Sequence, residues 1–423
     1  MAGSLRVTHG VAALRAAPDE TREQAGRDHI MTTGLRWLFV ALLAGHGIIH
    51  LLGAAKGFGA ADVAQLTQPI GVGQGVLWLL AAAVTLASAA LLASGAPTWW
   101  WLIALCGAAL SQVTIATSWS DAKAGTIVNA IVVLVAGYAF ASSGPFSFHA
   151  QYLDQAARAL AAVDPRPTRV TEADLEALPQ SLAAYVRASG AVGSPRVVSF
   201  HADFHGRIRS GPDAAWMSFT GQQVNTYGAS PKRIFVMDAS RSGLPVTVLH
   251  EYVGTTATMR VRLLSLLPIV NAAGPEMDRS ETVTVFNDLV VLAPGAIIDA
   301  PVTWTSIDPL HLHGEFTHGG QRVSAILTFN AQHDLVDFAS DDRMRASTDG
   351  KAFTPTRWST PLSGHHDTFG HRTLTSAEGV WGGPQPAALF TYLEFHLDNI
   401  SFNCSGAIRK RAESAPPLLA VGR

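Results

Sequence analysis

The chain has 423 residues, of which 48% are hydrophobic and only 15% are charged, and its formal net charge is −2. About a quarter of the residues of a soluble domain are charged, so part of this chain is expected to lie in a membrane. The net charge excludes a general nucleic-acid binder, which needs a basic stripe on its surface. The two cysteines, Cys106 and Cys404, are too few for a disulfide framework or a cysteine-based zinc site.

Four apolar stretches follow one another in the first third of the chain. Each approaches the roughly 20 residues that cross a hydrocarbon core, and the whole region carries very few charged side chains. A signal peptide would be a single stretch with a cleavage site. Trp99–Trp101 and Trp119 flank the third stretch, where interfacial aromatic belts lie. The expected transmembrane helices are Leu35–Leu52, Val72–Ala93, Thr98–Thr117 and Thr126–Phe140.

Basic residues are concentrated outside the two ends of this helical region, and the connecting loops carry only Lys56 and Lys123. Because cytoplasmic flanks carry the excess of Lys and Arg, the pattern predicts a multi-pass protein of the cell membrane with both termini in the cytoplasm. Met31 is an alternative start, and in that case Arg36 and the downstream residues alone decide the orientation. The basic flanking residues are Arg6, Arg15, Arg22, Arg27, Arg158, Arg166 and Arg169.

Two histidines inside the first stretch, His46 and His50, are candidate metal ligands. Their i, i+4 spacing puts both imidazoles on one helix face, where they could bind a metal or a porphyrin iron or form a proton path, and ionisable groups in a membrane are functional candidates. The alternative is that both rings hydrogen-bond a neighbouring helix and fix packing. Asp121, Lys123 and Asn129 are the candidate partners. No cofactor can be named from this pair.

The region between the predicted membrane helices and the β-rich part is predicted to form two short amphipathic helices separated by Asp164-Pro-Arg-Pro. Alternation with a period of two begins after Pro195 and continues almost to the C-terminus. The expected organisation is a disordered tail over residues 1–33, a four-helix transmembrane domain over 34–142, a helical linker over 150–190, a β-rich soluble domain over 195–404 and a disordered tail over 405–423.

The soluble domain is expected to be mainly antiparallel, because turn residues separate its strands at intervals of about ten residues. One large sheet cannot bury both faces alone, so a strongly curved or barrel-like sheet of about ten strands with one or two packed helices is predicted. The expected strands are Arg196–Asp203, His205–Arg209, Ala214–Gln222, Arg233–Ala239, Pro245–Tyr252, Ala257–Leu264, Val302–Ile307, Leu310–Thr317, Arg322–Asn330, Leu335–Ser340, His371–Leu374 and Leu389–Asn399.

A single helix interrupts the strands, with Ser280 as its expected N-cap, a body over Glu281–Leu292 and a stop at Pro294-Gly295. Its apolar residues, among them Phe286, are expected to face the sheet. The polar residues Glu281, Thr284 and Asp288 share another side. The candidate residues for a ligand pocket are Arg279, Glu281 and Asp288 of this segment, together with Trp358.

Two strands carry alternating polar residues that are candidate metal or acid–base groups. His311, His313 and Glu315 share one face of their strand, and His396 lies between Glu394 and Asp398 on the last strand. A site requires that the two faces coincide. The alternative is that both are half-solvated strands, which show the same alternation. His365, His366 and Asp367 are expected in a glycine-containing loop.

Several segments together resemble an uncharacterised bacterial family of membrane proteins, a domain of unknown function accompanied in some members by a four-helix head. That resemblance implies kinship and no activity. As a fold, the curved sheet is similar to those of bacterial lipoprotein and lipid carriers. The segments are LPQSLAAYVRASGAVG, FHGRIRSG, PEMDRSETVTVFNDLVVLAPGAI, VDFASDDR, RWSTPLSGH, YLEFHLDNISFN and the head pieces HGIIH and WSDAKAGTIVNAIV.

Three functions remain open, and no catalytic residue is assigned, because nucleophile elbows, phosphate loops and dinucleotide fingerprints are missing from the sequence. The first is a membrane-anchored binding or accessory protein whose sheet holds an apolar, lipid-like molecule. The second is an enzyme that acts on membrane-derived substrates. The third makes the membrane head the active part, handling haem or protons above a β scaffold. The expected partners are the lipid bilayer and an apolar small molecule, with no nucleic acid.

Overall fold

The computed structural model describes residues 17–163, 168–241, 243–368, 371–382 and 389–404. By its internal contacts the chain divides into two compact units, of which the first ends at Val133 and the second begins at Leu134. Residues 1–16 and 405–423, which were predicted to be disordered, lie outside the described residues.

The first unit is built from α1 (Ala17–Gly57), α2 (Val72–Ala93), α3 (Trp100–Thr117), the single turn α4 (Trp119–Ala122) and the first part of α5 (Gly125–Ser143). Four helical segments of the described chain are long and apolar enough to cross a membrane, so the prediction of four such helices is confirmed. They are Thr33–Gly57, Val72–Ala93, Trp100–Thr117 and Gly125–Ala161.

Two details of this unit differ from expectation. Residues 17–33, assigned to a disordered tail, belong to α1, because the segment is rich in strong helix formers such as Glu, Gln, Arg and Ala. Trp100 was expected in an interfacial belt, but it is 2% exposed and donates its indole N–H to the Ser88 carbonyl at 2.8 Å, whereas Trp99 and Trp119 remain exposed.

Close packing in this unit depends on small residues. The backbones of Gly57 in α1 and Gly75 in α2 approach closely, as is common between helices in membranes. A Cβ on Gly57 would lie 2.6 Å from the Gly75 Cα, and a Cβ on Gly75 would lie 3.1 Å from the Gly57 Cα. Arg36 donates to the carbonyls of Leu92 and Ala93 at the end of α2, which satisfies orphan carbonyls there. Large apolar side chains such as Leu38, which is 68% exposed, lie on the outer surface of the unit.

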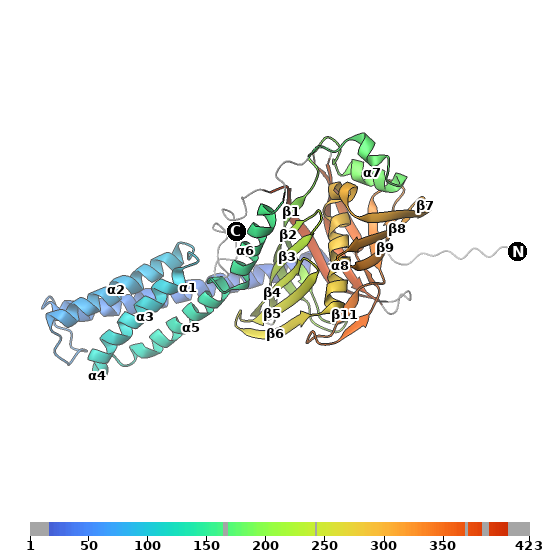
Figure 1. Ribbon diagram of the computed structural model, residues 1–423. Coiled ribbons are helices and arrows are strands. Elements are labelled where there is room, and N and C mark those ends of the chain that lie inside the picture. The colour runs from blue at the N-terminus through green and yellow to red at the C-terminus, as the bar shows by residue number, and fades with distance from the viewer. Residues whose placement is uncertain (1–16, 164–167, 242, 369–370, 383–388, 405–423) are drawn as a thin grey trace. The chain divides into compact units, whose positions relative to one another are not determined.

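The second unit is organised around one 14-stranded antiparallel sheet that is strongly curved (Figure 1), which confirms the predicted β architecture. Its path runs β6-β5-β4-β3-β2-β1-β16-β15-β13-β10-β9-β8-β7, and β14 pairs with β15. The strands are β1 (Ser199–Ile208), β2 (Met217–Thr226), β3 (Lys232–Arg241), β4 (Leu244–Val253), β5 (Thr256–Leu263), β6 (Leu267–Ala273), β7 (Val302–Asp308), β8 (His311–His318), β9 (Gln321–Phe329), β10 (Leu335–Ser340), β13 (Trp358–Ser359), β14 (Leu362–Thr368), β15 (His371–Trp381) and β16 (Phe390–Phe402), with a separate hairpin of β11 (Met344–Ala346) and β12 (Phe353–Pro355).

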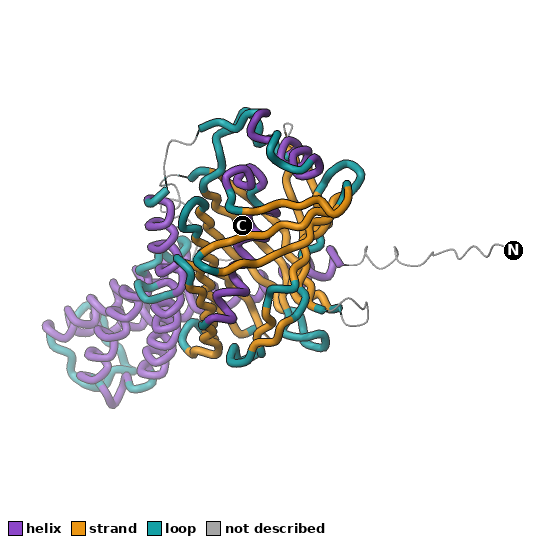
Figure 2. The backbone as a smooth tube through the Cα atoms, turned by 45° about the vertical axis from the view of Figure 1, so that its right-hand side comes forward, coloured by secondary structure: helices purple, strands orange, loops and turns teal. Residues whose placement is uncertain are grey.

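Helix α8 (Pro275–Val291) lies inside the curve of the sheet, and the strands wrap around it (Figure 2). The sheet meets both sides of the helix, so 13 of its 17 residues are buried. Phe286 is fully buried, with ring centroids 5.2–5.9 Å from those of Phe338, Phe316 and Trp304. The side of the helix that carries Glu281, Thr284 and Asp288 was expected to differ from the side facing the sheet, but it is buried against the sheet as well.

The start of α8 corrects the expected cap. The helix begins at Pro275, five residues before Ser280, because Gly274 adopts a φ of +113° and proline suits the first turn of a helix. The acidic residues Glu276 and Asp278 in that turn complement the helix dipole. Ser280 has another role, since its hydroxyl accepts from the Met344 N–H at 3.0 Å and anchors β11.

The convex face of the sheet is covered in part by α6 (Phe148–Ala161), which belongs to the expected linker. Phe148, Tyr152, Ala156 and Ala159 pack on outward-facing side chains of β2, β3 and β4, among them Ile234. The expected linker also contains η1 (Glu172–Leu175) and α7 (Gln180–Ala188), whose Leu182 and Val186 belong to the main core. These helices are therefore part of the packed β domain.

Several strands were missed by the periodicity. β6 follows a turn at Leu264 and Ser265, which both have positive φ, and its exposed apolar residues show no alternation. His365, His366 and Asp367 were expected in a loop, but the backbone of Leu362–Thr368 forms β14 on β15, with register shifts at Gly364 that break the period of two. Bulged and edge strands are defined by their partners, which a local pattern does not contain.

Replacing Phe286 with Ala should lower the free energy of unfolding by about 3–5 kcal/mol, the usual cost of deleting a core aromatic side chain. The measurement is urea unfolding of the detergent-solubilised protein, followed by tryptophan fluorescence. Leu267→Ala is the matched control, because Leu267 on β6 is 56% exposed and should change stability by less than about 0.5 kcal/mol. Small and equal effects of both changes would show that Phe286 is not a core residue.

Candidate functional site

A cavity of about 410 Å³ lies on the concave side of the sheet, between α8 and the first strands. It reaches the edge of the sheet where β1 and β3 end and where β2 and β4 begin. Ligand pockets commonly measure about 300–1,000 Å³ and have mainly apolar walls with a few convergent polar groups. The apolar wall includes Phe219, Phe235, Met237, Val248, Met259 and Val261.

A buried ionic cluster adjoins this apolar wall, and Asp288 of α8 is its first centre. Its Oδ2 accepts from Arg233 Nε at 2.9 Å, from Gln223 Nε2 at 2.7 Å and from Asn225 Nδ2 at 3.0 Å. Burial raises the pKa of Asp288, and the charge of Arg233 with the hydrogen bond from Asn225 offsets this only in part. The three hydrogen-bond donors around one oxygen favour the ionised form of this buried carboxyl group.

Glu281, about two turns earlier on α8, is the second centre of the cluster. Burial opposes its ionisation, but the charges of His250, Arg233 and Arg343 together hold the pKa of Glu281 well below its usual range. Its Oε2 lies 3.2 Å from His250 Nε2 and 3.6 Å from the nearest Arg233 nitrogen. The alignment is poor, so neither Glu281 Oε2 nor His250 Nε2 has a hydrogen-bond partner among the described residues.

Segments that carry the family resemblance meet at this cluster. Arg343, from VDFASDDR, lies 3.4 Å from Glu281 Oε1 and stacks its guanidinium 4.1 Å above the ring of Trp358, from RWSTPLSGH. Asn287 of α8 donates to Thr360 Oγ1 at 3.1 Å. Side chains from α8, β3, β4 and the segment after β10 therefore converge on one cavity, which is the candidate functional site.

Three of the four predicted pocket residues line this cavity, namely Glu281, Asp288 and Trp358. Arg279 does not line it. Its guanidinium pairs with Asp342, whose other oxygen accepts from the N–H and hydroxyl of Ser324 on β9. Arg279 therefore ties the helix to the second half of the sheet.

The predicted metal candidates of the sheet are not brought together. β8, which carries His311, His313 and Glu315, is separated from β16 by β9, β10, β13 and β15. His311 Nδ1 lies 2.8 Å from Asp308, and Glu315 pairs with Arg322. His396 stacks on His205 with 4.9 Å between ring centroids and contacts the Ser376 hydroxyl at 2.9 Å. Burial, and then the neighbouring His205, lower the pKa of His396.

Within the first unit, His46 and His50 share one hydroxyl. Their Nε2 atoms lie 2.9 and 2.8 Å from Ser111 Oγ, and His46 Nε2 lies 3.1 Å from Asn129 Oδ1. Asn129 donates its amide to Gln112 Oε1, so its oxygen is free to accept from His46. Asp121 instead accepts from the loop at Thr67 and Gln68. Across the described chain, no group of three or more His, Cys, Asp or Glu side chains is arranged to hold a metal ion.

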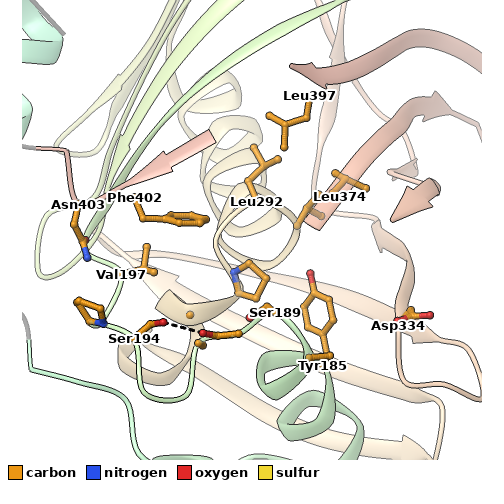
Figure 3. A pocket seen from close by; sticks show the side chains of 17 residues that line it. Tyr185, Ser189, Ser194, Val197, Leu292, Asp334, Leu374, Leu397, Phe402 and Asn403 are labelled. Carbon is orange, nitrogen blue, oxygen red and sulfur yellow. Dashed lines mark hydrogen bonds between the residues drawn. The ribbon is translucent and has the colours of Figure 1, made fainter. Parts of the chain in front are cut away.

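A second cavity, of about 430 Å³, lies at the opposite end of the concave face, where β1 begins and β16 and α8 end. Figure 3 shows Leu292, Leu374 and Leu397 grouped at one end of it, away from Ser194. Tyr185 of α7 also lines this cavity, and its hydroxyl donates to the Val290 carbonyl at 2.9 Å. No residue of this second cavity was a sequence-based candidate.

Five members of the ionic cluster were also missed as candidates, namely Gln223, Asn225, Arg233, His250 and Arg343. A signal was present, because Gln223 and Asn225 occupy alternate positions of β2 and so share its concave face. Arg233 on β3 pairs with Asn225 on β2, and His250 on β4 pairs with Phe235 on β3. Their polarity at inward positions conflicts with an apolar core, and this conflict marks a site.

The geometry defines a class of protein: a head of four membrane-length apolar helices, joined to a half-barrel sheet with a polar cluster in its hollow. The model of the "Family of unknown function (DUF6544)" matches residues 168–395, and the chain belongs to this family. No curated protein matches the chain.

Solved structures with partial similarity each match a little more than half of this chain. A domain from Vibrio parahaemolyticus, assigned by name to outer membrane lipoprotein sorting, has 10% identity and a TM-score of 0.29, covering 52% of this chain and 92% of that one. A DUF1329 family protein from Desulfovibrio piger has 12% identity and a TM-score of 0.30, covering 56% and 94%. LprF from Mycobacterium bovis has 11% identity and a TM-score of 0.20, covering 55% and 95%. Likenesses this low carry no inference about a ligand.

Asp288→Ala should destabilise the protein by roughly 3–5 kcal/mol, because it removes the carboxylate that accepts from the buried Arg233 guanidinium and leaves this group only the more distant Glu281. The double variant Asp288→Leu with Arg233→Met should recover much of this loss, since both charges are then removed. Urea unfolding of the detergent-solubilised protein measures both effects. Additive losses in the double variant would mean that the two side chains do not interact.

A half-buried carboxyl group, Asp337 on β10, is expected to give the domain a dependence on pH. Its Oδ1 has no hydrogen-bond partner among the described residues, and burial raises its pKa to about 6. The unfolded value is about 3.9, so the folded state binds the extra proton. This contribution to stability is therefore complete below about pH 4 and is lost as the pH rises through about 6.

Asp337→Asn should remove that dependence. The variant should match the parent near pH 4 and exceed it at pH 7 by on the order of 1–2 kcal/mol, after allowance for solvent screening. Urea midpoints measured at pH 4, 5, 6 and about 7 test the window set by the two pKa values. A variant that is less stable than the parent at every pH would contradict the assignment.

Proposed function

We propose that this protein is a membrane-anchored binding protein whose curved sheet holds an apolar, lipid-like molecule in the cavity beneath α8. The observation that carries the proposal is the cavity itself, with about 410 Å³ of space and a wall of Phe, Met and Val side chains beside a buried polar cluster. An apolar hollow of this size within a packed domain is costly unless it serves a ligand. The lipid bilayer supplies such molecules.

The membrane anchor is proposed to be multi-pass, in the cell membrane, with both termini in the cytoplasm. The four membrane-length helices and their exposed apolar surface support crossing. The basic residues that flank the helical region support the orientation. The domain boundaries expected from the sequence are retained in this proposal with two changes: residues 17–33 belong to α1, and the helical linker is counted as part of the β domain. A nucleic-acid partner is not proposed, because the net charge is −2.

The open edge of the cavity favours a ligand with an acidic head. Arg209, which follows β1, Arg241, which ends β3, and Arg345 of β11 all line the cavity. Each lacks an acidic partner among the described residues. The guanidinium groups of Arg345 and Arg209 lie 4.6 and 5.9 Å from the ring centroid of Phe390, which places two positive charges around one apolar surface. A carboxylate or phosphate head would be held there by charge-assisted hydrogen bonds.

The cavity should bind dansylundecanoic acid, with a competing fatty acid displacing it. Met259→Trp, which fills the cavity, should weaken binding by about tenfold or more, equivalent to ~1.4 kcal/mol. The measurements use full-length protein in amphipol, so any probe that binds to the transmembrane helices or the amphipol contributes equally in all variants. Val253→Trp, at an exposed position that does not line the cavity, is the control. If Met259→Trp and Val253→Trp bind the probe as tightly as the parent, the cavity is not the site.

An enzyme acting on membrane-derived substrates is the second candidate, and one observation favours it. His250 Nε2 and Glu281 Oε2 face each other at 3.2 Å within the cavity lining, and both lack a hydrogen-bond partner in the described chain. A bound group could be positioned there by a general acid–base pair. Incubation with total membrane lipids, followed by mass spectrometry, should show a product that His250→Gln abolishes. Unchanged lipids would leave binding as the function.

A further inference from the structure

The two cavities of the concave face have a common boundary. Val291 and Leu292, at the end of α8, line the first cavity beside the ionic cluster and also the second cavity at the opposite end of the sheet. Both side chains are buried, with exposed fractions of 3% and 6%. A single layer of side chains therefore separates the two spaces.

Strand β16 provides a second continuous wall. Leu393 and Phe395 line the first cavity and Leu397 lines the second. These residues occupy successive inward positions, so each step along the strand is about 7 Å. All three pack against the main core. A slender ligand following this strand would move from one cavity to the other within one such step.

The polar atoms around the second cavity are already engaged. The hydroxyl of Ser189 donates to the Val186 carbonyl at 2.7 Å, and that of Ser194 donates to the Gly190 carbonyl at 2.9 Å (Figure 3). Asn403 accepts from the Val198 N–H and donates to the Arg196 carbonyl. The Tyr185 hydroxyl is likewise used on α8. Because each of these four side chains already has a hydrogen-bond partner within the protein, they offer a ligand mainly apolar contact, in contrast to the polar groups of the first cavity.

We propose that the two cavities are parts of one elongated site, in which an unbranched hydrocarbon chain passes Leu292 and ends in the second cavity. This inference rests on the proposed function, because the first cavity must bind the polar end of the same molecule. α8 has 17 residues and is therefore about 26 Å long. Only a long chain reaches from the arginine-lined edge to the far end, so the second cavity selects for chain length.

Photolabelling tests where the chain ends. The probes are stearic and decanoic acid that carry a diazirine at the methyl end, added to full-length protein in amphipol. Labelled peptides are identified by mass spectrometry. Stearate should label the second-cavity segments 185–197 and 397–403, whereas decanoate should label strands β3 to β5 of the first cavity. Labelling of the same first-cavity peptides by both probes would overturn the proposal.

Variants that fill the second cavity test selection by length. Leu397→Trp and Leu374→Trp should weaken stearate binding by about fourfold for each methylene excluded from apolar surface, and they should leave decanoate binding unchanged. Leu267→Trp, on the exposed edge of β6 and outside both cavities, is the matched control. Leu292→Ala, which widens the passage, should strengthen stearate binding. Equal effects on the two acids would overturn the proposal.

The two hypotheses fail differently. If the parent protein binds neither acid, the proposed function is wrong. If it binds both acids but the filling variants do not discriminate between them, the binding function stands and the elongated site is wrong. Circular dichroism of each variant identifies one that does not fold, and Leu374→Trp and Leu397→Trp fill the cavity from different strands, so either can serve alone.

Discussion

The burial of both sides of α8 is the constraint on which the rest of the β domain depends. One side carries Phe286 and its apolar neighbours, and the other carries Glu281 and Asp288. A charged side chain can be buried only where opposite charges and donors replace water. The sheet satisfies both requirements because it curls: β8 to β10 cover the apolar side, while β2 to β4 bring Arg233, His250 and amide donors to the acidic side.

The same constraint explains why the family segments are dispersed along the chain. VDFASDDR contributes Phe338 to the aromatic cluster, Asp342 to Arg279 and Arg343 to Glu281. The segment with Trp358 and Thr360 completes the surroundings of Arg343 and Asn287. The helix is therefore held by three interactions from one stretch of chain, one aromatic and two ionic. Changes to any of these residues would affect the helix and the cavity together.

The two cavities differ in the polar groups that they leave for a ligand. The ionic cluster and the arginines belong to the first cavity, whereas the hydroxyls of Ser189 and Ser194 in the second cavity are used within the protein. This difference matches the chemistry of an amphiphile, whose head needs charge and whose chain needs none. In the proposed function, the four membrane-length helices anchor the domain close to such molecules. The buried cluster contributes to the fold and lines the proposed ligand site.

The sequence alone predicted the membrane-length helices, the curved antiparallel sheet and the helix at Glu281–Leu292. These depend on periodicity, segment length and turn chemistry, which are local properties. It also proposed Arg279, Glu281, Asp288 and Trp358 as pocket candidates, of which all but Arg279 line the first cavity. It placed His311 and His396 in one candidate site only on the condition that two faces coincide, and the order of strands separates them.

Only the tertiary structure decided which strands are neighbours and what faces what. Arg233 and His250 look like ordinary strand residues in the sequence, and they become partners of α8 because the sheet folds back over a helix some 30–55 residues away. β14 exists because β15 pairs with it, and the second cavity exists because α7 and the last part of β16 are brought together at one end of the hollow. Long-range pairing is set by the burial of whole faces, and no local pattern encodes it.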